Sequence, residues 1–467
     1  MKLLLFLLVC FPLFLSSQEI TGEWYGKLSI QGTEIPIVIH VTKTESTYSS
    51  ELDSPTQKAF GIKADSTFFT DPEFQFQVSK LKAKYSGKLT NQTITGVFTQ
   101  NGMDIPLIFT REKSNLEKAK KPQDPIEPFP YFSENITVKN EVANLTLSGT
   151  LTKPTKKGNY PLVILISGSG PQNRDEELMG HKPFLVISDY LTRNGCAVFR
   201  YDDRGVAEST GDFRTATSFD FSKDVDCIVN YFSKRKDFKK SKIGLMGHSE
   251  GGLIAPIVAS TNKEVDFIIL LAGPGVSGAE ILKLQSKLIT KSQDPNWTDD
   301  GSSDKLYDGI VSIFAKNQDL NKCQAETRLF LNNLYKDSIE SIEKSTGLSF
   351  DDFIESTTQE LCSPWLKTFI ITDAEDYLKT LKIPVLALNG SKDIQVDSHQ
   401  NLLEIERILT ENGNKNFKTI EIKNQNHLFQ SCTSCTIEEY SKLSETFSFN
   451  TLNEIIQWLQ YQNIIRD

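Results

Sequence analysis

The first part of the chain, from residue 18 to about residue 115, alternates between apolar and polar positions. Apolar side chains occupy every second position in several short runs, and turn-forming pairs such as Gln31–Gly32 and Asn101–Gly102 separate these runs. This two-residue period is typical of antiparallel β-strands. Because a closed sheet leaves no exposed edge, residues 18–115 are predicted to form a small antiparallel β-barrel or sandwich. The clearest runs are Ile35–Val41, Phe74–Val78 and Ile94–Phe98.

The pattern changes after a lysine- and proline-rich stretch at residues 116–130. Proline fixes φ and favours extended neighbours, so this stretch is predicted to be a semi-rigid linker. Beyond residue 131 the apolar runs are continuous, with helix-like segments such as Phe184–Leu191 and Asp224–Tyr231 between them. Strands covered by helices on both faces have this pattern, so residues 131–467 are predicted to form a doubly wound, mostly parallel α/β sheet. The runs are Leu162–Ile166, Ala197–Tyr201, Ile243–Met246, Phe267–Leu271, Val385–Leu388 and Thr419–Ile422.

One long interval, from about residue 276 to residue 378, contains no strand-like run. Its sequence is charged and has the pattern of helices. A loop of this length without its own secondary structure is uncommon inside a compact domain. We therefore expect a helical cap inserted between two strands of the sheet.

The first 17 residues have the pattern of an export signal. Lys2 precedes an apolar run, Leu3–Leu15, which small polar residues follow. The run is too short to span a bilayer as a mature helix, which favours a cleaved signal peptide over residues 1–17. Lipid attachment at Cys10 is the weaker alternative, because the apolar stretch continues beyond it. The predicted location is secreted or periplasmic, with no membrane insertion after the signal is removed.

Charge and cysteine content narrow the classes of partner. The 467-residue chain carries a net charge of −9, which repels phosphate backbones and makes nucleic acid an unsuitable partner. In an oxidising compartment cysteines such as Cys432 and Cys435 can form disulfides. No second Cys or His pair lies at zinc-ligand spacing, and no glycine motif matches a nucleotide-binding loop, so we expect neither metal nor cofactor. Nothing in the sequence indicates an oligomeric state.

The segment Gly247-His-Ser-Glu-Gly251 contains the candidate nucleophile, Ser249. It follows the buried run that starts at Ile243 and precedes a helix-like run that starts at Leu253. A serine on a sharp strand-to-helix turn needs small residues two positions away on each side, which Gly247 and Gly251 provide. The alternative is a glycine-rich turn whose serine only caps the helix.

A serine hydroxyl needs a base to accept its proton and an acid to orient that base. Of the five histidines, His427 lies in a loop just after the last predicted strand, where it can reach the strand ends. Asp393 follows the strand Val385–Leu388 at the carboxyl edge of the sheet, where open α/β sheets place their sites. Asp397 is the competing carboxylate, which we expect to cap the next helix. The chain order Ser249, Asp393, His427 is the one expected for a sheet of this type.

An oxyanion hole needs backbone N–H groups that point at the developing negative charge. We expect one from Glu250, the residue after the nucleophile. The second is expected from the glycine-rich loop that follows Leu162–Ile166, with Ser169 preferred and Gly170 as the alternative.

Four further features have a structural interpretation. The clusters Arg174–Glu177 and Tyr201–Gly205 are interpreted as ion-paired loop anchors rather than catalytic groups. His248 adjoins the nucleophile, and its side chain is expected to point away from the site. Trp365 either lines the acyl pocket or packs inside the cap.

Together these residues resemble a known family. From about residue 131 to residue 467 the chain is similar to secreted bacterial α/β-hydrolases of the serine-aminopeptidase-like, esterase type. The resemblance implies a carboxylic ester hydrolase for short acyl groups, with the triad at Ser249, Asp393 and His427. It extends more loosely to an N-terminal barrel, whose opening Gly22–Gly26 resembles that of calycin-like barrels. The matching segments are Ser167–Gln172, Arg174–Asp175, Gly180–Pro183, Tyr201–Gly205, Gly247–Gly252, Leu271–Gly275, Asn389–Asp393 and Asn426–Gln430.

Three functions are compatible with these residues. The first is a serine carboxylesterase that acts on a small acyl ester through an acyl-enzyme intermediate. The second is a serine peptidase of the aminopeptidase type, which would need acidic groups near the pocket, such as Asp351, Asp352 or Glu355 in the cap. The third is a non-catalytic binding protein with a hydrolase fold, against which the intact triad argues.

The chain departs from the family at Ser431–Cys435, where a local disulfide would change the histidine loop.

Overall fold

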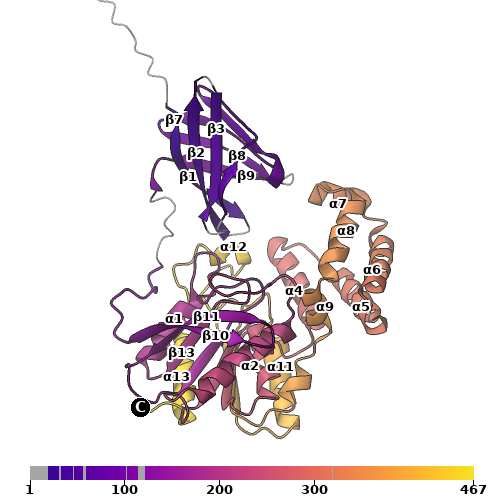
Figure 1. The fold of residues 1–467 in the computed structure, drawn as a ribbon. Helices are drawn as coiled ribbons and strands as arrows, with labels where there is room; N and C mark the ends of the chain where they lie inside the picture. The colour runs from indigo at the N-terminus through magenta and orange to yellow at the C-terminus, as the bar shows by residue number, and fades with distance from the viewer. Residues whose placement is uncertain are drawn as a thin grey trace, which may run out of the picture. The chain divides into compact units, whose positions relative to one another are not determined.

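A computed structural model of the protein describes residues 19–30, 33–45, 47–55, 59–100, 103–113, 121–317 and 319–466. The chain divides into two compact units, Met1–Ala119 and Lys120–Asp467 (Figure 1). The predicted signal peptide at 1–17 lies outside the described residues. So do residues 116–120 of the predicted linker and the predicted turns at Gln31–Gly32 and Asn101–Gly102.

The N-terminal unit is a curled antiparallel sheet in the order β4-β3-β2-β1-β9-β8-β7-β6-β5. Alternate residues of its strands point inward, and Trp24, Phe74 and Tyr85 fill the core. The two ends of the sheet approach each other, since Ser50 Oγ on β3 lies 2.6 Å from Thr67 Oγ1 on β5, the last strand of the sheet. The predicted all-β character is therefore confirmed. The strands are β1 (Gly22–Ile30), β2 (Thr33–Thr44), β3 (Thr47–Ser54), β4 (Ala59–Lys63), β5 (Ser66–Thr70), β6 (Glu73–Val78), β7 (Ala83–Thr90), β8 (Thr93–Gln100) and β9 (Met103–Thr110).

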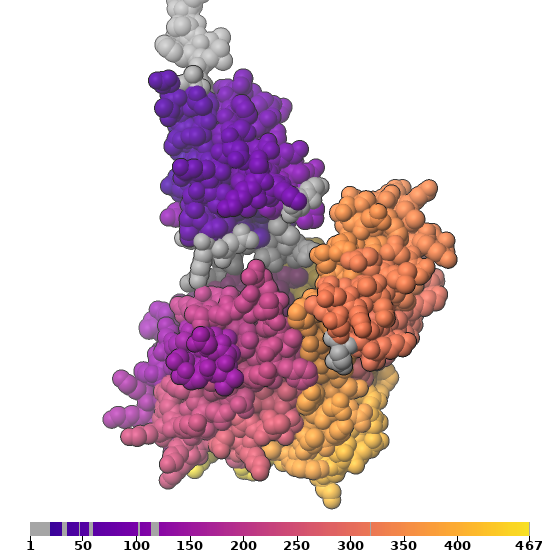
Figure 2. Space-filling view, turned by 45° about the vertical axis from the view of Figure 1, so that its right-hand side comes forward, coloured from indigo at the N-terminus to yellow at the C-terminus, as the bar shows by residue number. Residues whose placement is uncertain are grey.

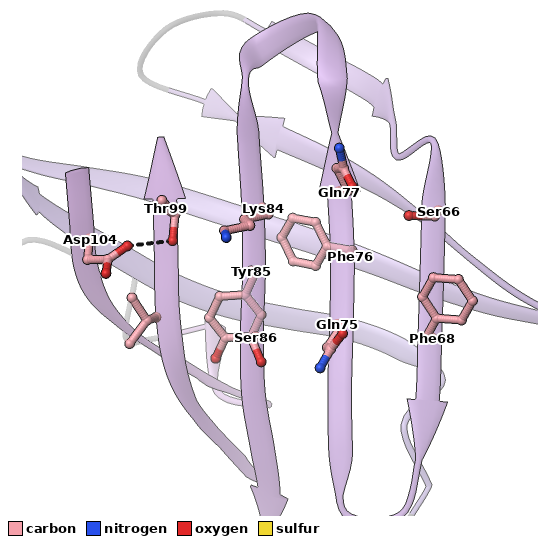
Figure 3. Close-up of a pocket in the computed structure, with 11 residues that line it drawn as sticks. Ser66, Phe68, Gln75, Phe76, Gln77, Lys84, Tyr85, Ser86, Thr99 and Asp104 are labelled. Atoms are coloured by element: carbon pink, nitrogen blue, oxygen red, sulfur yellow. Dashed lines mark hydrogen bonds between the residues drawn. The ribbon is translucent and has the colours of Figure 1, made fainter. Parts of the chain in front are cut away.

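A hollow of about 490 Å³ lies on the solvent side of this sheet (Figure 3). Gln75 and Gln77 on β6 and Lys84 on β7 line it, and each alternates along its strand with side chains of the core. At its edge the Thr99 hydroxyl donates to the Asp104 carboxylate (2.6 Å). In β6 and β7 the polar residues are thus exposed and the residues between them are buried, as the two-residue period predicts.

The C-terminal unit contains an eight-stranded sheet in the order β10-β11-β13-β12-β14-β15-β16-β17. β10 and β11 pair antiparallel, β11 pairs antiparallel with β13, and every other neighbouring pair is parallel. The predicted mostly parallel sheet is therefore confirmed, and each of the six predicted runs lies in a strand. The strands are β10 (Phe132–Asn140), β11 (Leu145–Lys153), β12 (Leu162–Ile166), β13 (Ala197–Tyr201), β14 (Ile243–His248), β15 (Phe267–Leu271), β16 (Val385–Gly390) and β17 (Phe417–Ile422).

Helices cover both faces of this sheet and create two separate apolar cores (Figure 1). Ile187 of α1 and Trp458 of α13 belong to the core on one face. Ile228 of α2, Leu253 of α3 and Ile405 of α11 belong to the core on the other face. Burial on both sides explains why the strands are continuous apolar runs. The helices are α1 (Pro183–Arg193), α2 (Ser218–Lys234), α3 (Gly251–Ala259), α11 (Ser398–Glu411) and α13 (Phe449–Tyr461).

The predicted cap is a run of helices between β15 and β16, much of which stands out in orange in Figure 2. Its base packs closely, because a Cβ on Gly278 would lie 2.0 Å from the Phe369 carbonyl oxygen. Among the described residues, no helix of the cap or of the sheet domain combines the length and apolarity needed to cross a bilayer. The cap helices are α4 (Gly278–Gln293), α5 (Ser302–Lys316), α6 (Leu320–Tyr335), α7 (Ile339–Thr346), α8 (Phe350–Leu361), α9 (Pro364–Ile371) and α10 (Glu375–Leu378).

Candidate active site

Ser249 lies on the sharp turn between β14 and α3. Its φ of 52° is in the left-handed region, which a residue with a side chain adopts only when its surroundings hold it there. A Cβ on Gly247 would lie 1.9 Å from the Gly251 carbonyl oxygen, and one on Gly251 would lie 2.2 Å from the Ile166 carbonyl oxygen. The predicted need for glycine on both sides of the serine is therefore confirmed. The Ser249 amide donates to the Leu271 carbonyl (2.8 Å), which ties the turn to β15.

The loops after β16 and β17 bring an acid and an imidazole together. His427 Nδ1 lies 2.7 Å from Asp393 Oδ2, and both side chains are buried. The other carboxylate oxygen of Asp393 accepts from the amides of Gln395 (2.8 Å) and Val396 (2.9 Å), which fixes its orientation. Because the carboxylate accepts from Nδ1, Nε2 is the ring nitrogen that can accept a proton. Asp397 instead caps α11 by accepting from the Gln400 amide (2.7 Å), as predicted.

Ser249 and His427 border the same cavity, which has a volume of about 220 Å³. One wall is apolar and comes from the loop before α1, the histidine loop and the short helix α12 (Ile437–Tyr440). The other wall is the glycine-rich loop after β12. The lining residues are Gly168, Ser169, Gln172, Glu176, Leu178, Met179, His248, Ser249, Gln395, His427, Leu428, Ile437 and Tyr440.

One predicted oxyanion donor is the neighbour of Ser249 in sequence, and the other lines the same cavity. Glu250 follows Ser249 directly, and Ser169 lines the cavity while Gly170 does not. The loop runs close to the nucleophile, since a Cβ on Gly168 would lie 3.2 Å from Ser249 Cβ. Within the described part of the chain, the amides of Ser169 and Glu250 donate to no protein acceptor. They are therefore free to bind a ligand oxygen.

The structure agrees with one interpretation of the residues around the turn and corrects another. Arg174 pairs with Asp202 (2.6 Å) and Asp175 pairs with Arg200, as expected of loop anchors. Glu176 is buried and is also paired, with His248 Nδ1 as its partner (2.9 Å). The His248 side chain was expected to point away from the site, yet it borders the cavity.

Nothing in the sequence distinguishes Glu176 from Glu177, its neighbour. The contact with His248 joins positions 72 residues apart, and only the fold brings them together.

Buried carboxylates surround the turn and the glycine-rich loop. Burial raises the pKa of Glu250, although the Ser218 hydroxyl and the Trp365 indole donate to its carboxylate. Burial also raises the pKa of Asp203, which accepts from the Ser167 hydroxyl (2.8 Å) and the Gln172 amide (3.0 Å). Asp203 therefore holds the loop that carries Ser169 at both of its ends.

Known proteins are similar to this chain in sequence. A family described as "Serine aminopeptidase, S33" matches residues 183–321, which include Ser249 but neither Asp393 nor His427. Esterase EstD from Thermotoga maritima is 24% identical over 337 residues, which span 72% of this chain and 69% of EstD. The chain is a hydrolase of the α/β-hydrolase fold.

Solved structures resemble the hydrolase more distantly. Esterase Pf2001 from Pyrococcus furiosus is 16% identical, with a TM-score of 0.41 over 71% of this chain and 93% of that chain. The hypothetical protein PA2218 from Pseudomonas aeruginosa is 13% identical, with a TM-score of 0.42 over 73% of this chain and 97% of that chain.

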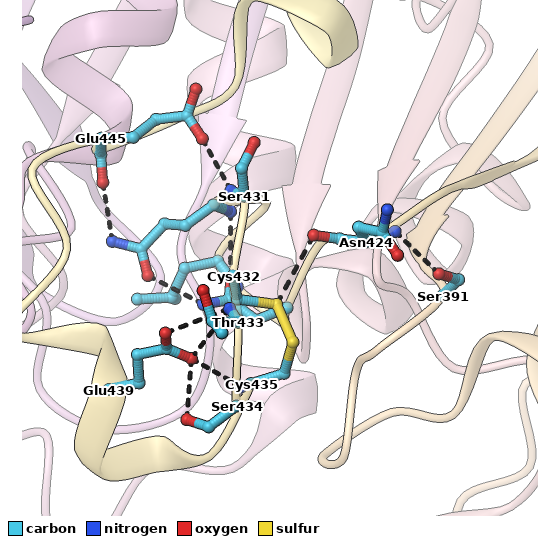
Figure 4. Close-up of a disulfide and its surroundings, with 12 residues drawn as sticks. Ser391, Asn424, Ser431, Cys432, Thr433, Ser434, Cys435, Glu439 and Glu445 are labelled. Atoms are coloured by element: carbon cyan, nitrogen blue, oxygen red, sulfur yellow. Dashed lines mark hydrogen bonds between the residues drawn. A yellow bond between two sulfur atoms is a disulfide. The ribbon is translucent and has the colours of Figure 1, made fainter.

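The hydrolase carries a disulfide between Cys432 and Cys435, just after the histidine loop (Figure 4). The Cys432 amide donates to the Asn424 carbonyl (3.1 Å), which holds the start of this segment against the end of β17. The Glu439 carboxylate accepts from the amides of Thr433 (3.0 Å) and Cys435 (2.6 Å). The disulfide segment therefore leads directly into α12, which borders the cavity. Among the described residues, the free cysteines are Cys196, Cys227, Cys323 and Cys362.

His181 and His399, the other two histidines of the C-terminal unit, do not line the cavity beside Ser249. His181 is fully buried, and its Nε2 donates to the Tyr440 carbonyl (2.9 Å). Burial and the nearby Lys121 ammonium lower the pKa of His181 to about 4. His40 pairs with Asp53 in the N-terminal unit (2.8 Å), and His399 is exposed on α11.

Proposed function

We propose that this hydrolase is a serine carboxylesterase for short acyl esters, with Ser249 as nucleophile, His427 as base and Asp393 as the acid that orients the base. The observation that carries the proposal is the hydrogen bond between His427 Nδ1 and Asp393 (2.7 Å), beside a serine held at φ 52° in the same cavity. A buried carboxylate behind an imidazole fixes its tautomer and stabilises the imidazolium that forms during the reaction.

The chemistry proceeds in two halves. Ser249 Oγ bonds to the ester carbonyl carbon while its proton passes to His427 Nε2, and the carbonyl oxygen becomes an oxyanion. The amides of Ser169 and Glu250 donate to that oxyanion. The bond to the alcohol oxygen then breaks as Nε2 returns the proton to it, which leaves an acyl-enzyme. In the second half water attacks the acyl carbon and gives its proton to His427 Nε2. The bond to Ser249 Oγ then breaks as Nε2 returns the proton, which releases the carboxylic acid and the free serine.

The size and lining of the cavity support a short acyl group. A volume of about 220 Å³ fits a small molecule or part of a larger one. Leu178, Met179 and Ile437 provide an apolar wall, and they offer nothing to bind a charge. An acetyl or butyryl group buries its methyl and methylene carbons against such a wall, whereas long chains exceed the space.

The peptidase alternative needs a free carboxylate for a substrate ammonium group. Glu176 borders the cavity, but its Oε1 already accepts from His248 and from the Gly168 amide (2.7 Å). In the cap, Glu355 pairs with Arg328 (2.6 Å) on the exposed side of α8. Neither arrangement favours an amine subsite, so esters are the better substrates for this site.

A panel of p-nitrophenyl acetate, p-nitrophenyl butyrate and alanine p-nitroanilide tests the proposal. Esters are expected to be hydrolysed faster than the anilide, and Ser249→Ala is expected to abolish ester hydrolysis and labelling by a fluorophosphonate probe. Ser345→Ala, on exposed α7, serves as the control and should match the wild type. Preference for the anilide would establish the peptidase instead. Absence of both hydrolysis and labelling in the wild type would establish a non-catalytic binding protein.

We also propose that the protein is exported to a secreted or periplasmic location. The apolar pattern of residues 1–17 supports this, and so does the disulfide between Cys432 and Cys435, since disulfides persist in oxidising compartments. Intact mass of the protein from cell fractions is the test. A mass that starts near residue 18 outside the cytoplasm is expected, whereas a lipid-bearing Cys10 or a full-length cytoplasmic chain would contradict the proposal.

A further inference from the structure

Glu176 and His248 join the three backbone segments that must be aligned for catalysis. Glu176 Oε1 accepts from the Gly168 amide (2.7 Å), in the loop that carries Ser169. The same oxygen accepts from Nδ1 of His248, the residue before the nucleophile (2.9 Å). On its other side, His248 Nε2 donates to the main-chain carbonyl of His427 (3.0 Å). One carboxylate and one imidazole therefore connect the oxyanion loop, the nucleophile turn and the base loop.

The hydrogen bonds determine the protonation state of this pair. A carbonyl oxygen only accepts, so His248 Nε2 carries a proton. An ionised carboxylate only accepts hydrogen bonds, and Glu176 Oε1 lies 2.9 Å from Nδ1, so beside a charged Glu176 Nδ1 carries a proton as well. His248 is consequently an imidazolium paired with a carboxylate. Burial alone would lower the pKa of His248, but the charge and hydrogen bond of Glu176, the His427 carbonyl and the charge of Asp393 outweigh burial and raise it.

We propose that Glu176 and His248 form a buried positioning pair that holds the oxyanion donor at Ser169 and the base His427 in register with Ser249. The inference rests on the proposed esterase activity of the same site. Neither side chain transfers a proton to substrate; both act through the backbones that they hold. The ring centroids of His248 and His427 lie 4.8 Å apart, so a displacement of one ring moves its neighbour. Misplacement of reacting groups by about 1 Å is enough to lower a rate roughly a hundredfold.

Substitution of either partner is expected to lower kcat more than it raises KM. Glu176→Gln still accepts from Gly168 but loses the negative charge that keeps His248 doubly protonated. His248→Gln removes the ring and the bond to the His427 carbonyl. Each is expected to reduce kcat for p-nitrophenyl acetate by roughly 10- to 100-fold, with KM within about threefold of the wild type. The rate of fluorophosphonate labelling of Ser249 should fall by a similar factor.

A double-mutant cycle shows whether the two residues act as a unit. If they form one positioning pair, Glu176→Gln combined with His248→Gln reduces kcat by about as much as the more severe single variant. Losses that multiply in the double variant would overturn the pairing. Glu177→Gln is the matched control, because it makes the same change in charge one residue away, where the side chain accepts from Asn173 Nδ2 (3.4 Å). It is expected to keep kcat within about twofold of the wild type.

Active-site titration separates loss of positioning from loss of folding. kcat is expressed per active site from the burst of p-nitrophenol, so unfolded chains do not contribute. Should Glu176→Gln fail to fold, Glu176→Asp keeps the charge on a shorter side chain and is expected to lower kcat by a smaller factor. A wild-type kcat in Glu176→Asp and in every folded variant of the pair overturns the inference.

Failure of this inference is distinguishable from failure of the proposed function. If Ser249→Ala keeps esterase activity, the proposed nucleophile is wrong. The positioning pair would then have no catalytic serine with which to align Ser169 and His427. If Ser249→Ala abolishes activity while folded Glu176→Gln equals the wild type in kcat and labelling rate, the esterase proposal stands and the positioning pair is refuted.

Discussion

The indole of Trp365, on helix α9 of the cap, donates a 2.9 Å hydrogen bond to the carboxylate of Glu250, the residue that follows Ser249. Glu250 is buried, and the Ser218 hydroxyl is its other side-chain donor (2.6 Å). The cap is thereby attached to the nucleophile turn itself. Trp365 does not border the cavity around Ser249, so the alternative in which it lines the acyl pocket is not supported.

Trp365→Phe is expected to destabilise the protein because it leaves the buried Glu250 carboxylate with one donor fewer. The ring remains, so the stacking on Phe369 is largely preserved. Loss of a partner from a buried, charged acceptor costs roughly 1–3 kcal/mol of the free energy of unfolding. Urea unfolding of the full chain measures it. Trp297→Phe, in the loop after α4, is the control, and an equal loss in both variants would contradict a specific role for the bond to Glu250.

Asp393→Asn is expected to reduce kcat by a factor on the order of 10⁴, because an amide in place of the carboxylate no longer holds the His427 tautomer. The change preserves size, so the fold should persist. Asp397→Asn is the matched control four residues away, where Asn caps α11 as well as Asp does. Steady-state kinetics on p-nitrophenyl acetate compare the two. A larger loss of kcat in Asp397→Asn than in Asp393→Asn would mean that the wrong carboxylate has been assigned to the base.

The parallel strands could be predicted from the sequence because burial on both faces leaves a local signal. Two examples are the unbroken apolar runs Val385–Leu388 and Phe267–Leu271. The first lies in β16 and the second forms β15. The hairpin of β10 and β11 was not predicted as two strands. Only the positions that face the core, such as Val138 and Leu147, are apolar in these strands, and polar residues lie between them. Two short alternating runs next to a linker have no distinctive signature.

The same distinction between local and long-range information applies to the site. The sequence around Ser249 predicts a strained turn, because the requirement for Gly247 and Gly251 is local. The roles of Glu176 and His248 could not be predicted, since they arise where loops distant in sequence meet. The sequence indicated ion-paired anchors at Arg174–Glu177 but not their partners, which are Arg200 for Asp175 and His248 for Glu176.

Removal of the Cys432–Cys435 disulfide is expected to weaken substrate binding more than chemistry. The bridge spans three residues of sequence and leads into α12, whose Ile437 and Tyr440 line the cavity. A ring this small restricts the unfolded chain by about 2 kcal/mol in the chain-entropy model. Cys432→Ser with Cys435→Ser, or treatment with a dithiol reductant, should therefore lower the melting temperature and raise KM for p-nitrophenyl butyrate.

The control for the disulfide variant is Cys227→Ser. Cys227 is a free, half-buried cysteine whose thiol donates to the Lys139 carbonyl (3.3 Å), and a serine hydroxyl can replace that bond. Its KM should stay at the wild-type value with and without reductant. An unchanged KM in the double variant would show that the bridge does not order α12.

Acid is expected to destabilise the protein through His181. Burial, together with the Lys121 charge, lowers the pKa of His181 to about 4 in the folded state, whereas in the unfolded chain a histidine titrates near 6.5. Between these values the unfolded state binds more protons, so the free energy of unfolding falls as the pH is lowered from about 6.5 to about 4. His181→Gln removes this contribution. The difference in stability between wild type and variant should shrink by an amount on the order of 2 kcal/mol between pH 6.5 and pH 4.5.

Urea unfolding at several pH values measures it, with His399→Gln, on the exposed face of α11, as the control whose difference from the wild type stays constant. A difference for His181→Gln that is equally constant would mean that this buried imidazole takes up its proton at the same pH in the folded and unfolded chain.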